Sequence, residues 1–201
     1  VVLPADKIGS YGGNIVNPHM GNIDFLEDML REFPLMFTND LKRIVPNIIK
    51  AWDVNLGATE YTFHIRKGIK WSDGVAFTSD AFLFWYQAYA MNTELNPHGI
   101  SHFKDGNNKM GVMTKIDDYS FKVSFSTPNG IILAKMCRFR PVPYLPGHYL
   151  KQFHPSYSDQ AQVEKLAKGE GFSSWVELFN NKRYYFDNPA SPTIFAWIPT
   201  N

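Results

Sequence analysis

Strict alternation of apolar and polar residues marks the segment from residue 60 to residue 66. Tyr61, Phe63 and Ile65 occupy the apolar positions, and polar residues, among them His64, occupy the positions between them. Successive side chains of a strand point to opposite faces of a sheet. The pattern therefore predicts a half-buried strand with His64 on its polar face.

Helical spacing predicts a first helix that begins at Asn22, a residue type suited to capping, and ends before Pro34. Four apolar residues recur there at intervals of three and four: Leu26, Met29, Leu30 and Phe33. Asp24, Glu27 and Asp28 lie near its start and Arg31 near its end, which is the charge order that the helix dipole favours.

A second helix is expected directly after a turn at residues 72–74, which read SDG. Thr78 is a capping residue, and Phe77 before it can pack on Phe82 as a hydrophobic staple. Large apolar residues then cover most of the helix surface: Phe82, Leu83, Phe84, Trp85, Tyr86 and Tyr89. This distribution indicates a helix buried on most sides. For Trp71 and Trp85 we favour core packing over ligand stacking.

A β-hairpin is predicted around the pair Asp117 and Asp118, which suit a turn better than paired catalytic carboxylates. Val112, Thr114 and Ile116 alternate before the turn; after it, Tyr119, Phe121, Val123 and Phe125 alternate with outward-facing Ser120, Lys122 and Ser124. Residues 131–136 read as a helix or a strand, and the prolines of residues 138–146 favour an extended segment.

Two short helices are expected in the last third of the chain. Ser158 is placed to cap the first, which ends at Gly169, and Ser174 with Glu177 forms a capping box for the second. Strands, helices and hairpins together indicate a mixed α/β (α+β) fold.

The composition excludes several classes of function. Lys and Arg total 20 and Asp and Glu total 19 in 201 residues, a net charge of +1, so a basic nucleic-acid-binding face is not expected. The longest apolar run, residues 81–86, is far shorter than the ~20 residues that cross a bilayer. The single Cys137 has no internal disulfide partner.

Motifs for catalysis are largely missing, since we find no nucleophile elbow, phosphate loop or paired CxxC. The polar loop of residues 92–108 offers one metal candidate: His98 and His102, four residues apart, with Asp105 downstream. Gly99 and Pro97 weaken a common face for the two imidazoles. We therefore favour a solvated or ligand-facing loop, and expect no metal and no cofactor.

Several segments resemble the family 5 extracellular solute-binding proteins, the oligopeptide and dipeptide receptors of ABC importers. Residues 61–74 (YTFHIRKGIKWSDG) are similar to a family strand that reads like YTFHLRKGVKWSDG, at the expected distance from residues 46–53 and 77–80. The hairpin at 117–125 and the segment 143–149 resemble further family elements, as do residues 11–13. Residues 188–197 are similar to a branch that includes sugar-binding as well as peptide-binding receptors.

The resemblance implies a two-lobed periplasmic-binding-protein-like fold, of which this chain contains one lobe, with a mixed sheet, flanking helices and a hairpin-rich subdomain. Residues 1–40 would begin lobe I, residues 41–180 would form its subdomain, and residues 181–201 would return to lobe I. Family members are longer, so the chain looks like an N-terminal fragment without the second lobe. Ligand binds between the lobes and stabilises their closure.

The resemblance also implies which residues face the ligand. The loop that leaves the first strand corresponds to Asn17, His19, Met20, Gly21 and Asn22, and the loop after the long helix to residues 92–98, in which we select Asn92, Asn96 and His98. Amide and imidazole groups donate and accept hydrogen bonds, as a polar ligand needs.

The function expected is that of a non-catalytic receptor of an ABC importer, located in the periplasm or outside the cell, either free or lipid-anchored. It would be a monomer that captures oligopeptides and delivers them to a membrane permease; an oligosaccharide ligand is the alternative. Two other classes stay open: an enzyme that uses His98 or His102, and an interaction module without a ligand.

Overall fold

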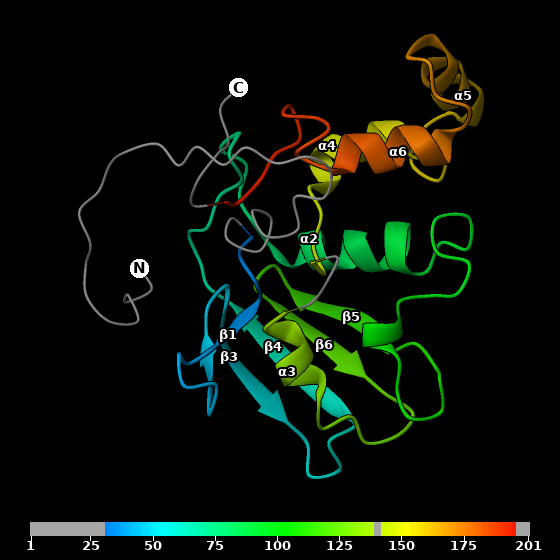
Figure 1. Ribbon diagram of the computed structural model, residues 1–201. Coiled ribbons are helices and arrows are strands. Elements are labelled where there is room, and N and C mark those ends of the chain that lie inside the picture. The colour runs from blue at the N-terminus through cyan, green and yellow to red at the C-terminus, as the bar shows by residue number, and fades with distance from the viewer. Residues whose placement is uncertain (1–30, 139–141, 196–201) are drawn as a thin grey trace.

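The computed structural model describes residues 31–138 and 142–195, and its centre is a four-stranded antiparallel sheet (Figure 1). The strand order is β3-β4-β6-β5, with bounds Ile49–Val54 (β3), Glu60–Ile65 (β4), Ser120–Ser124 (β6) and Val112–Asp117 (β5). A second sheet pairs β1 (Leu35–Phe37) with β2 (Ile44–Pro46). The mixed α/β class is therefore confirmed.

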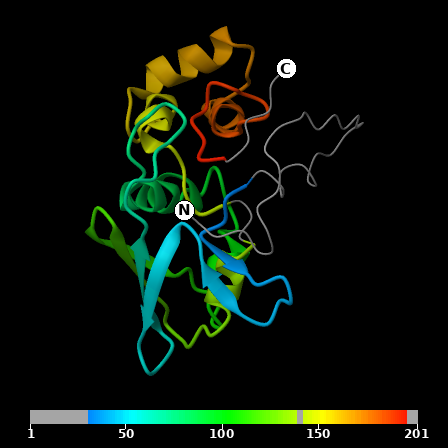
Figure 2. The same ribbon diagram turned by 90° about the vertical axis from the view of Figure 1, so that its left-hand side faces the viewer.

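Some helices pack beside the sheet, and the helices of the last third of the chain form a separate group. Helix α2 (Ser79–Phe84) runs directly into a π-helical turn, η1 (Trp85–Ala90), and α3 (Ile132–Met136) lies near β1. A short 3-10 turn, η2 (Ser101–Phe103), lies between η1 and β5. The last helices, seen from two sides in Figures 1 and 2, form what we call the helical unit: α4 (Gly147–Leu150), η3 (Lys151–Phe153), α5 (Gln160–Gly169) and α6 (Trp175–Arg183).

The strand predicted at residues 60–66 is β4, and its apolar residues are buried as expected. Tyr61, Phe63 and Ile65 face the core, and Phe63 pairs in register with Phe121 of β6. His64 lies on the polar face, where its Nε2 is 2.8 Å from Asp53 Oδ2 and its Nδ1 is 3.2 Å from Ser120 Oγ. These contacts link β4 to both of its neighbouring strands.

The start of α2 is built as the sequence predicts. Thr78 accepts a hydrogen bond from the backbone N–H of Asp80, and the rings of Phe77 and Phe82 are 5.8 Å apart. Phe82 also lies 4.5 Å from the ring of Phe121 in β6. This stacked pair joins the helix layer to the sheet.

The π-helical turn that follows was not predicted. Met91 N donates to Tyr86 O, five residues earlier, in place of the α-helical partner four residues earlier. Trp85, Ala88, Tyr89 and Ala90 of this turn are buried, so the apolar surface predicted for this helix continues through the change of geometry.

Two local predictions are wrong in detail. The helix after residue 158 is capped by Asp159, which accepts from Gln162 N, and not by Ser158, whose hydroxyl donates to Lys151 O. Residues 31–33 are not helical, so the helix expected before Pro34 does not extend to its predicted end; its earlier residues lie outside the described part of the chain.

The predicted hairpin is formed by β5 and β6, but the alternating residues of its first strand lie on the exposed face. Val112 and Ile116 are each 55% exposed, and Met113 is the residue of β5 that enters the core. Residues 131–136 resolve to the helical option, as α3.

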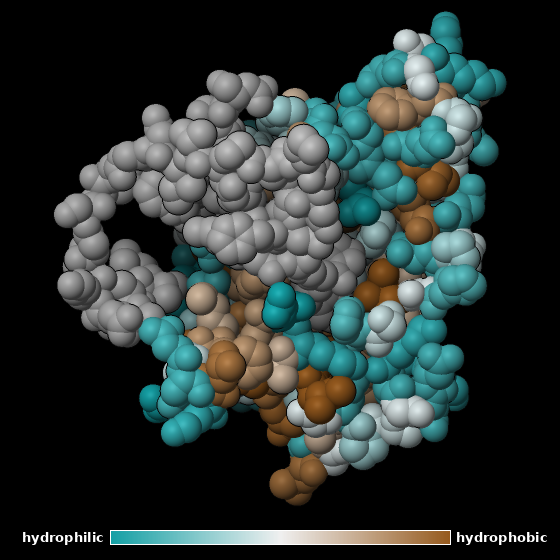
Figure 3. Space-filling view, viewed as in Figure 1, coloured by the Kyte–Doolittle hydropathy of each residue, from teal (hydrophilic) through white to brown (hydrophobic). Residues whose placement is uncertain are grey.

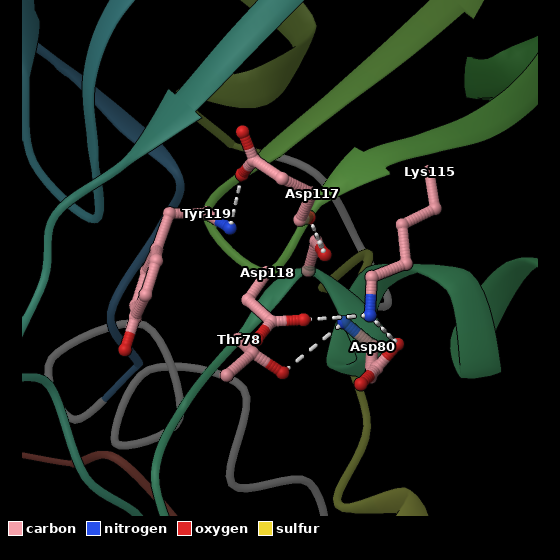
Figure 4. A network of polar contacts seen from close by, with 7 residues as sticks. Thr78, Asp80, Lys115, Asp117, Asp118 and Tyr119 are labelled. Atoms are coloured by element: carbon pink, nitrogen blue, oxygen red, sulfur yellow. Dashed lines mark hydrogen bonds and ion pairs between the residues drawn. The ribbon is translucent and has the colours of Figure 1, made fainter.

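A polar network joins the tip of this hairpin to the start of α2 (Figure 4). Lys115 Nζ lies 2.8 Å from Asp80 and 2.9 Å from Asp118. These side chains are largely exposed, so their ion pairs contribute little stability. Ser79 is fully buried, and both its backbone N–H and its hydroxyl donate to carbonyls of Asp118 and Asp117. These neutral hydrogen bonds fix the hairpin on the helix.

Apolar side chains are exposed around β1 and the start of α3 (Figure 3). They include Met36 and Phe37 of β1 and Ile131, which is 60% exposed. Within residues 31–138 and 142–195, no helix has the length and apolar character needed to cross a membrane.

Candidate functional site

An aromatic groove lies between η1 on one side and the end of α6 with the segment after it on the other. We use this name for the groove lined by Arg31, Trp71, Trp85, Tyr89, Val142, Tyr144, Leu145, Pro146, residues 183–186 and residues 191–195. It encloses about 70 Å³. Its walls come from segments far apart in the sequence, and both ends of the described chain, Arg31 and Phe195, reach it.

Half-buried aromatic rings form the wall contributed by residues 184–195. The ring of Tyr185 lies 5.7 Å from that of Phe195, and the rings of Tyr184 and Phe186 are 5.6 Å apart. The Arg183 guanidinium lies 4.5 Å above the ring of Tyr89. Such a wall offers flat faces that can pack on apolar side chains or on sugar rings.

Two hydrogen bonds, one of them to a side chain, fix the other end of this wall to the SDG turn. Ser72 N donates to Thr193 O at 2.7 Å, and Thr193 N donates to Ser72 Oγ at 3.1 Å. The Thr193 hydroxyl is buried and has no hydrogen-bond partner in the part of the chain that the structure describes. Thr193 itself lines the groove.

A hydrogen bond between Asp73 and His148 joins the same turn to the helical unit. His148 Nε2 lies 2.7 Å from Asp73 Oδ2, and the imidazole packs 5.9 Å from the ring of Trp71. Burial raises the pKa of the Asp73 carboxyl, but hydrogen bonds from His148 and from Val75 N outweigh burial and leave this pKa below its ordinary value. Asp73 is therefore a carboxylate near neutral pH.

Tyr144 lies on the floor of the groove as a neutral donor. Its hydroxyl donates to the backbone carbonyl of Glu32, and desolvation raises its pKa far above the ordinary value. Trp71 and Trp85 are buried beside it, so the prediction that both indoles belong to the core is confirmed. Because Trp71 and Trp85 are buried, the more exposed aromatic rings of the groove are those of residues 184–186 and Phe195.

The predicted ligand residues are only partly within the described chain. Asn17, His19, Met20, Gly21 and Asn22 lie outside it. The second set lies in the loop after η1, away from the groove: Asn92, Asn96 and His98.

The two asparagines of that loop make hydrogen bonds within the protein. Asn92 Oδ1 accepts from the backbone N–H groups of Glu94 and Leu95, and Asn96 Nδ2 donates to Tyr89 O at 2.7 Å. His98 is exposed. Of the three, His98 therefore has the side chain most accessible to a ligand.

The metal candidate is not assembled. Asp105 accepts hydrogen bonds from the hydroxyl and backbone N–H of Ser126 and from the N–H groups of Asn107 and Lys109. The Ser126 hydroxyl bond is the main reason that the pKa of Asp105 falls to about 2. The described residues contain no group of three His, Cys, Asp or Glu side chains arranged to hold a metal ion.

Sequence reasoning missed the aromatic groove as a site. The available signal was the run of three aromatics, Tyr184-Tyr185-Phe186, directly after a predicted helix and before a proline-rich segment. Local patterns do not show that these residues meet Trp71 and Tyr89, more than ninety positions earlier.

Solved structures show the class of protein to which this fold belongs. A structure of the oligopeptide-binding protein OppA matches the whole chain with a TM-score of 0.89 and 32% identity, and the chain covers 31% of that structure. The periplasmic binding protein MelB of Agrobacterium fabrum C58, solved with stachyose, shares the fold over 88% of the chain at a TM-score of 0.61 and 23% identity. The fold is that of a solute-binding protein.

The sequence model of the bacterial extracellular solute-binding proteins, family 5, matches residues 43–191, and the chain belongs to this family. The periplasmic α-galactoside-binding protein of Rhizobium meliloti (strain 1021) is 29% identical over 89% of the chain. The periplasmic oligopeptide-binding protein OppA of Escherichia coli (strain K12) is also 29% identical, over 69% of the chain. The chain spans about a quarter of the length of these two relatives.

Proposed function

We propose that the protein is the solute-binding component of an ABC importer and that it captures oligopeptides without changing them chemically. The observation that carries this proposal is the match of the whole chain to OppA at a TM-score of 0.89 and 32% identity. Family 5 proteins are binding proteins that carry solutes, which supports a role without catalysis.

The proposal extends to the organisation of the protein around this chain. We place residues 1–40 at the start of lobe I, residues 41–180 in its subdomain and residues 181–201 in the segment that returns to lobe I. A second lobe would close over the ligand and complete a desolvated site. The protein would act in the periplasm or outside the cell and deliver its ligand to a membrane permease.

An oligosaccharide is the second candidate ligand, and two observations favour it. The α-galactoside-binding relative matches 89% of the chain, against 69% for OppA of Escherichia coli. The aromatic groove also presents ring faces, the surfaces on which sugars stack. Extended peptides are held mainly by backbone hydrogen bonds, so the two ligand classes depend differently on these rings.

Thermal unfolding of the full-length receptor, measured with pools of short peptides and with α-galactosides, tests both candidates. A ligand at a hundred times its Kd stabilises the folded state by about 2.7 kcal/mol. A rise in Tm with peptides alone supports the first candidate, and a rise with oligosaccharides alone supports the second. No shift with either pool would contradict the proposed function.

A matched pair of groove variants separates stacking from hydrogen bonding. Y185A removes a ring of the aromatic groove, whereas Y185F keeps the ring and removes only the hydroxyl. If the groove stacks on sugar rings, Y185A weakens binding by about tenfold, equivalent to ~1.4 kcal/mol, and Y185F retains most of the affinity. Equal affinity for wild type and Y185A would exclude this stacking contact.

A further inference from the structure

The loop of residues 92–98 is held by hydrogen bonds within itself and by a hydrogen bond to Tyr89 of η1. Asn92 Oδ1 accepts from the N–H groups of Glu94 and Leu95, which closes a turn at the start of the loop. Asn96 then donates through Nδ2 to Tyr89 O at 2.7 Å, and its N–H donates to Asn92 O at 2.8 Å. Glu94 lies between Asn92 and Asn96.

The side chain of Glu94 binds across to the helical unit, 81 positions further along the chain. The indole N–H of Trp175, the first residue of α6, donates to Glu94 Oε2 at 3.1 Å. Trp175 is only 3% exposed, so its N–H would lose its partner if the loop moved away. A buried donor without a partner costs about 1–3 kcal/mol, which favours the loop position in which Glu94 accepts this hydrogen bond.

His154 packs against the indole ring of Trp175. Its ring lies 4.9 Å from the Trp175 ring and 5.3 Å from that of Phe179. Because a carbonyl can only accept, His154 Nε2 donates to Ala88 O of η1 at 2.9 Å, and Nδ1 accepts from Ser156 N at 3.1 Å. These contacts hold the indole in one orientation.

We propose that Glu94 and Trp175 are positioning residues, whose hydrogen bond holds the loop of residues 92–98 in the shape that meets the ligand. This inference rests on the proposed function and on the expectation, implied by the family resemblance, that this loop faces the ligand. The helical unit then determines the geometry of a ligand loop that it does not itself contain. A receptor with a different first turn of α6 would present His98 at a different position.

Hydrogen–deuterium exchange on the full-length receptor without ligand tests the positioning directly. W175F removes the indole N–H and keeps an aromatic ring against His154, so exchange at the amides of residues 93–98 should rise about three- to tenfold, in line with the loss of one hydrogen bond. W52F, a substitution in β3 of the sheet, is the matched control and should leave this exchange unchanged. Unchanged exchange in W175F would overturn the inference.

A double-mutant cycle assigns the effect to the hydrogen bond itself. E94Q keeps an acceptor and should behave nearly as wild type, whereas E94A should raise the exchange of the loop as W175F does. The variant with both E94A and W175F should show no further increase, because each substitution removes the same bond. Additive effects in the double variant would overturn the assignment.

Ligand affinity distinguishes failure of this inference from failure of the proposed site. We expect W175F and E94A to bind the peptide or oligosaccharide identified by thermal unfolding about three- to tenfold more weakly, and E94Q to restore binding. If loop exchange rises but affinity is unchanged, the loop is held as inferred and the proposed ligand contact of Asn92, Asn96 and His98 is wrong. If exchange does not rise, the inference fails whichever ligand binds.

Discussion

Replacing Phe82 by alanine should cost more stability than most substitutions in this chain. The phenyl ring is fully buried in α2 and stacks on Phe121 of the sheet at 4.5 Å. It also lies 5.8 Å from Phe77 and 5.8 Å from Tyr144, whose ring reaches the aromatic groove. Removal of this ring therefore disturbs the contact between sheet, helix and groove floor together.

The magnitude follows from the burial and the cavity. A fully buried Phe→Ala substitution costs about 3–5 kcal/mol, because apolar contacts are lost and the surroundings only partly collapse. F82L retains most of the side-chain volume and should cost less than about 1.5 kcal/mol. Since natural domains are stable by about 5–15 kcal/mol, F82A removes a large fraction of the total.

Urea unfolding followed by circular dichroism measures the difference, with F37A as the control. Phe37 lies on β1 with 36% of its surface exposed, so its truncation should cost under about 1.5 kcal/mol. The midpoint should fall in F82A without a change of slope. A loss for F82A equal to that of F37A, or equal losses for F82A and F82L, would refute the packing argument.

Three further outcomes are expected, each checked by urea or thermal unfolding. G147A places a methyl group 2.8 Å from Cγ of Phe84 and should lower the free energy of unfolding by about 1–3 kcal/mol. The control G130A, whose methyl group would meet nothing within 4 Å, should be nearly neutral. Equal losses of stability in the two variants would contradict the close packing of α4 on Phe84. Burial lowers the pKa of His154, so the unfolded chain binds more protons than the folded chain, and stability should fall as the pH drops below about 6.5. The substitution H154Q should weaken this pH dependence of stability. An unchanged pH profile in H154Q would argue against a buried neutral imidazole. The pKa of Asp105 is lowered to about 2, so the stability that the Asp105 carboxylate contributes is present above about pH 4 and is lost as the pH falls toward 2. D105N should therefore be less stable than wild type at pH 7 and closer to it at pH 2. A constant difference in stability across this range would contradict the lowered pKa.

Local patterns predicted the elements whose determinants are neighbours in sequence. The alternation around Tyr61, Phe63 and Ile65 gave β4, and the cap and staple at Thr78 and Phe77 gave the start of α2. Each of these features depends on contacts within a few positions or on the two faces of a strand. Such information is complete in a short window of sequence.

The face of β5 that is buried could not be predicted from such a short window of sequence. Val112, Thr114 and Ile116 are β-branched and alternate, as in many buried strand faces, yet the core takes Met113 between them. Which face of a strand is buried depends on the register with β6, where Met113 pairs with Val123. That pairing is a property of the assembled sheet.

The aromatic groove could not be predicted from the sequence because its walls are non-local. The aromatic groove combines Trp71 and Tyr89 with residues 183–195, and the loop asparagines use their polar groups on backbone partners. Residue type shows that Asn92 or Asn96 can bind a ligand. It does not show that part of the hydrogen-bonding capacity of these two amides is already used by backbone groups of the protein.

Both outer strands of the four-stranded sheet carry an irregularity in register, at Ile49/Ala51 in β3 and at Lys115/Asp117 in β5. A regular strand at the margin of a sheet offers a row of free backbone groups to another molecule, and the exposed Val112 and Ile116 would strengthen such pairing. A bulge bends the strand and interrupts this row. The two irregularities thus make edge-to-edge pairing of neighbouring copies at these strands less favourable.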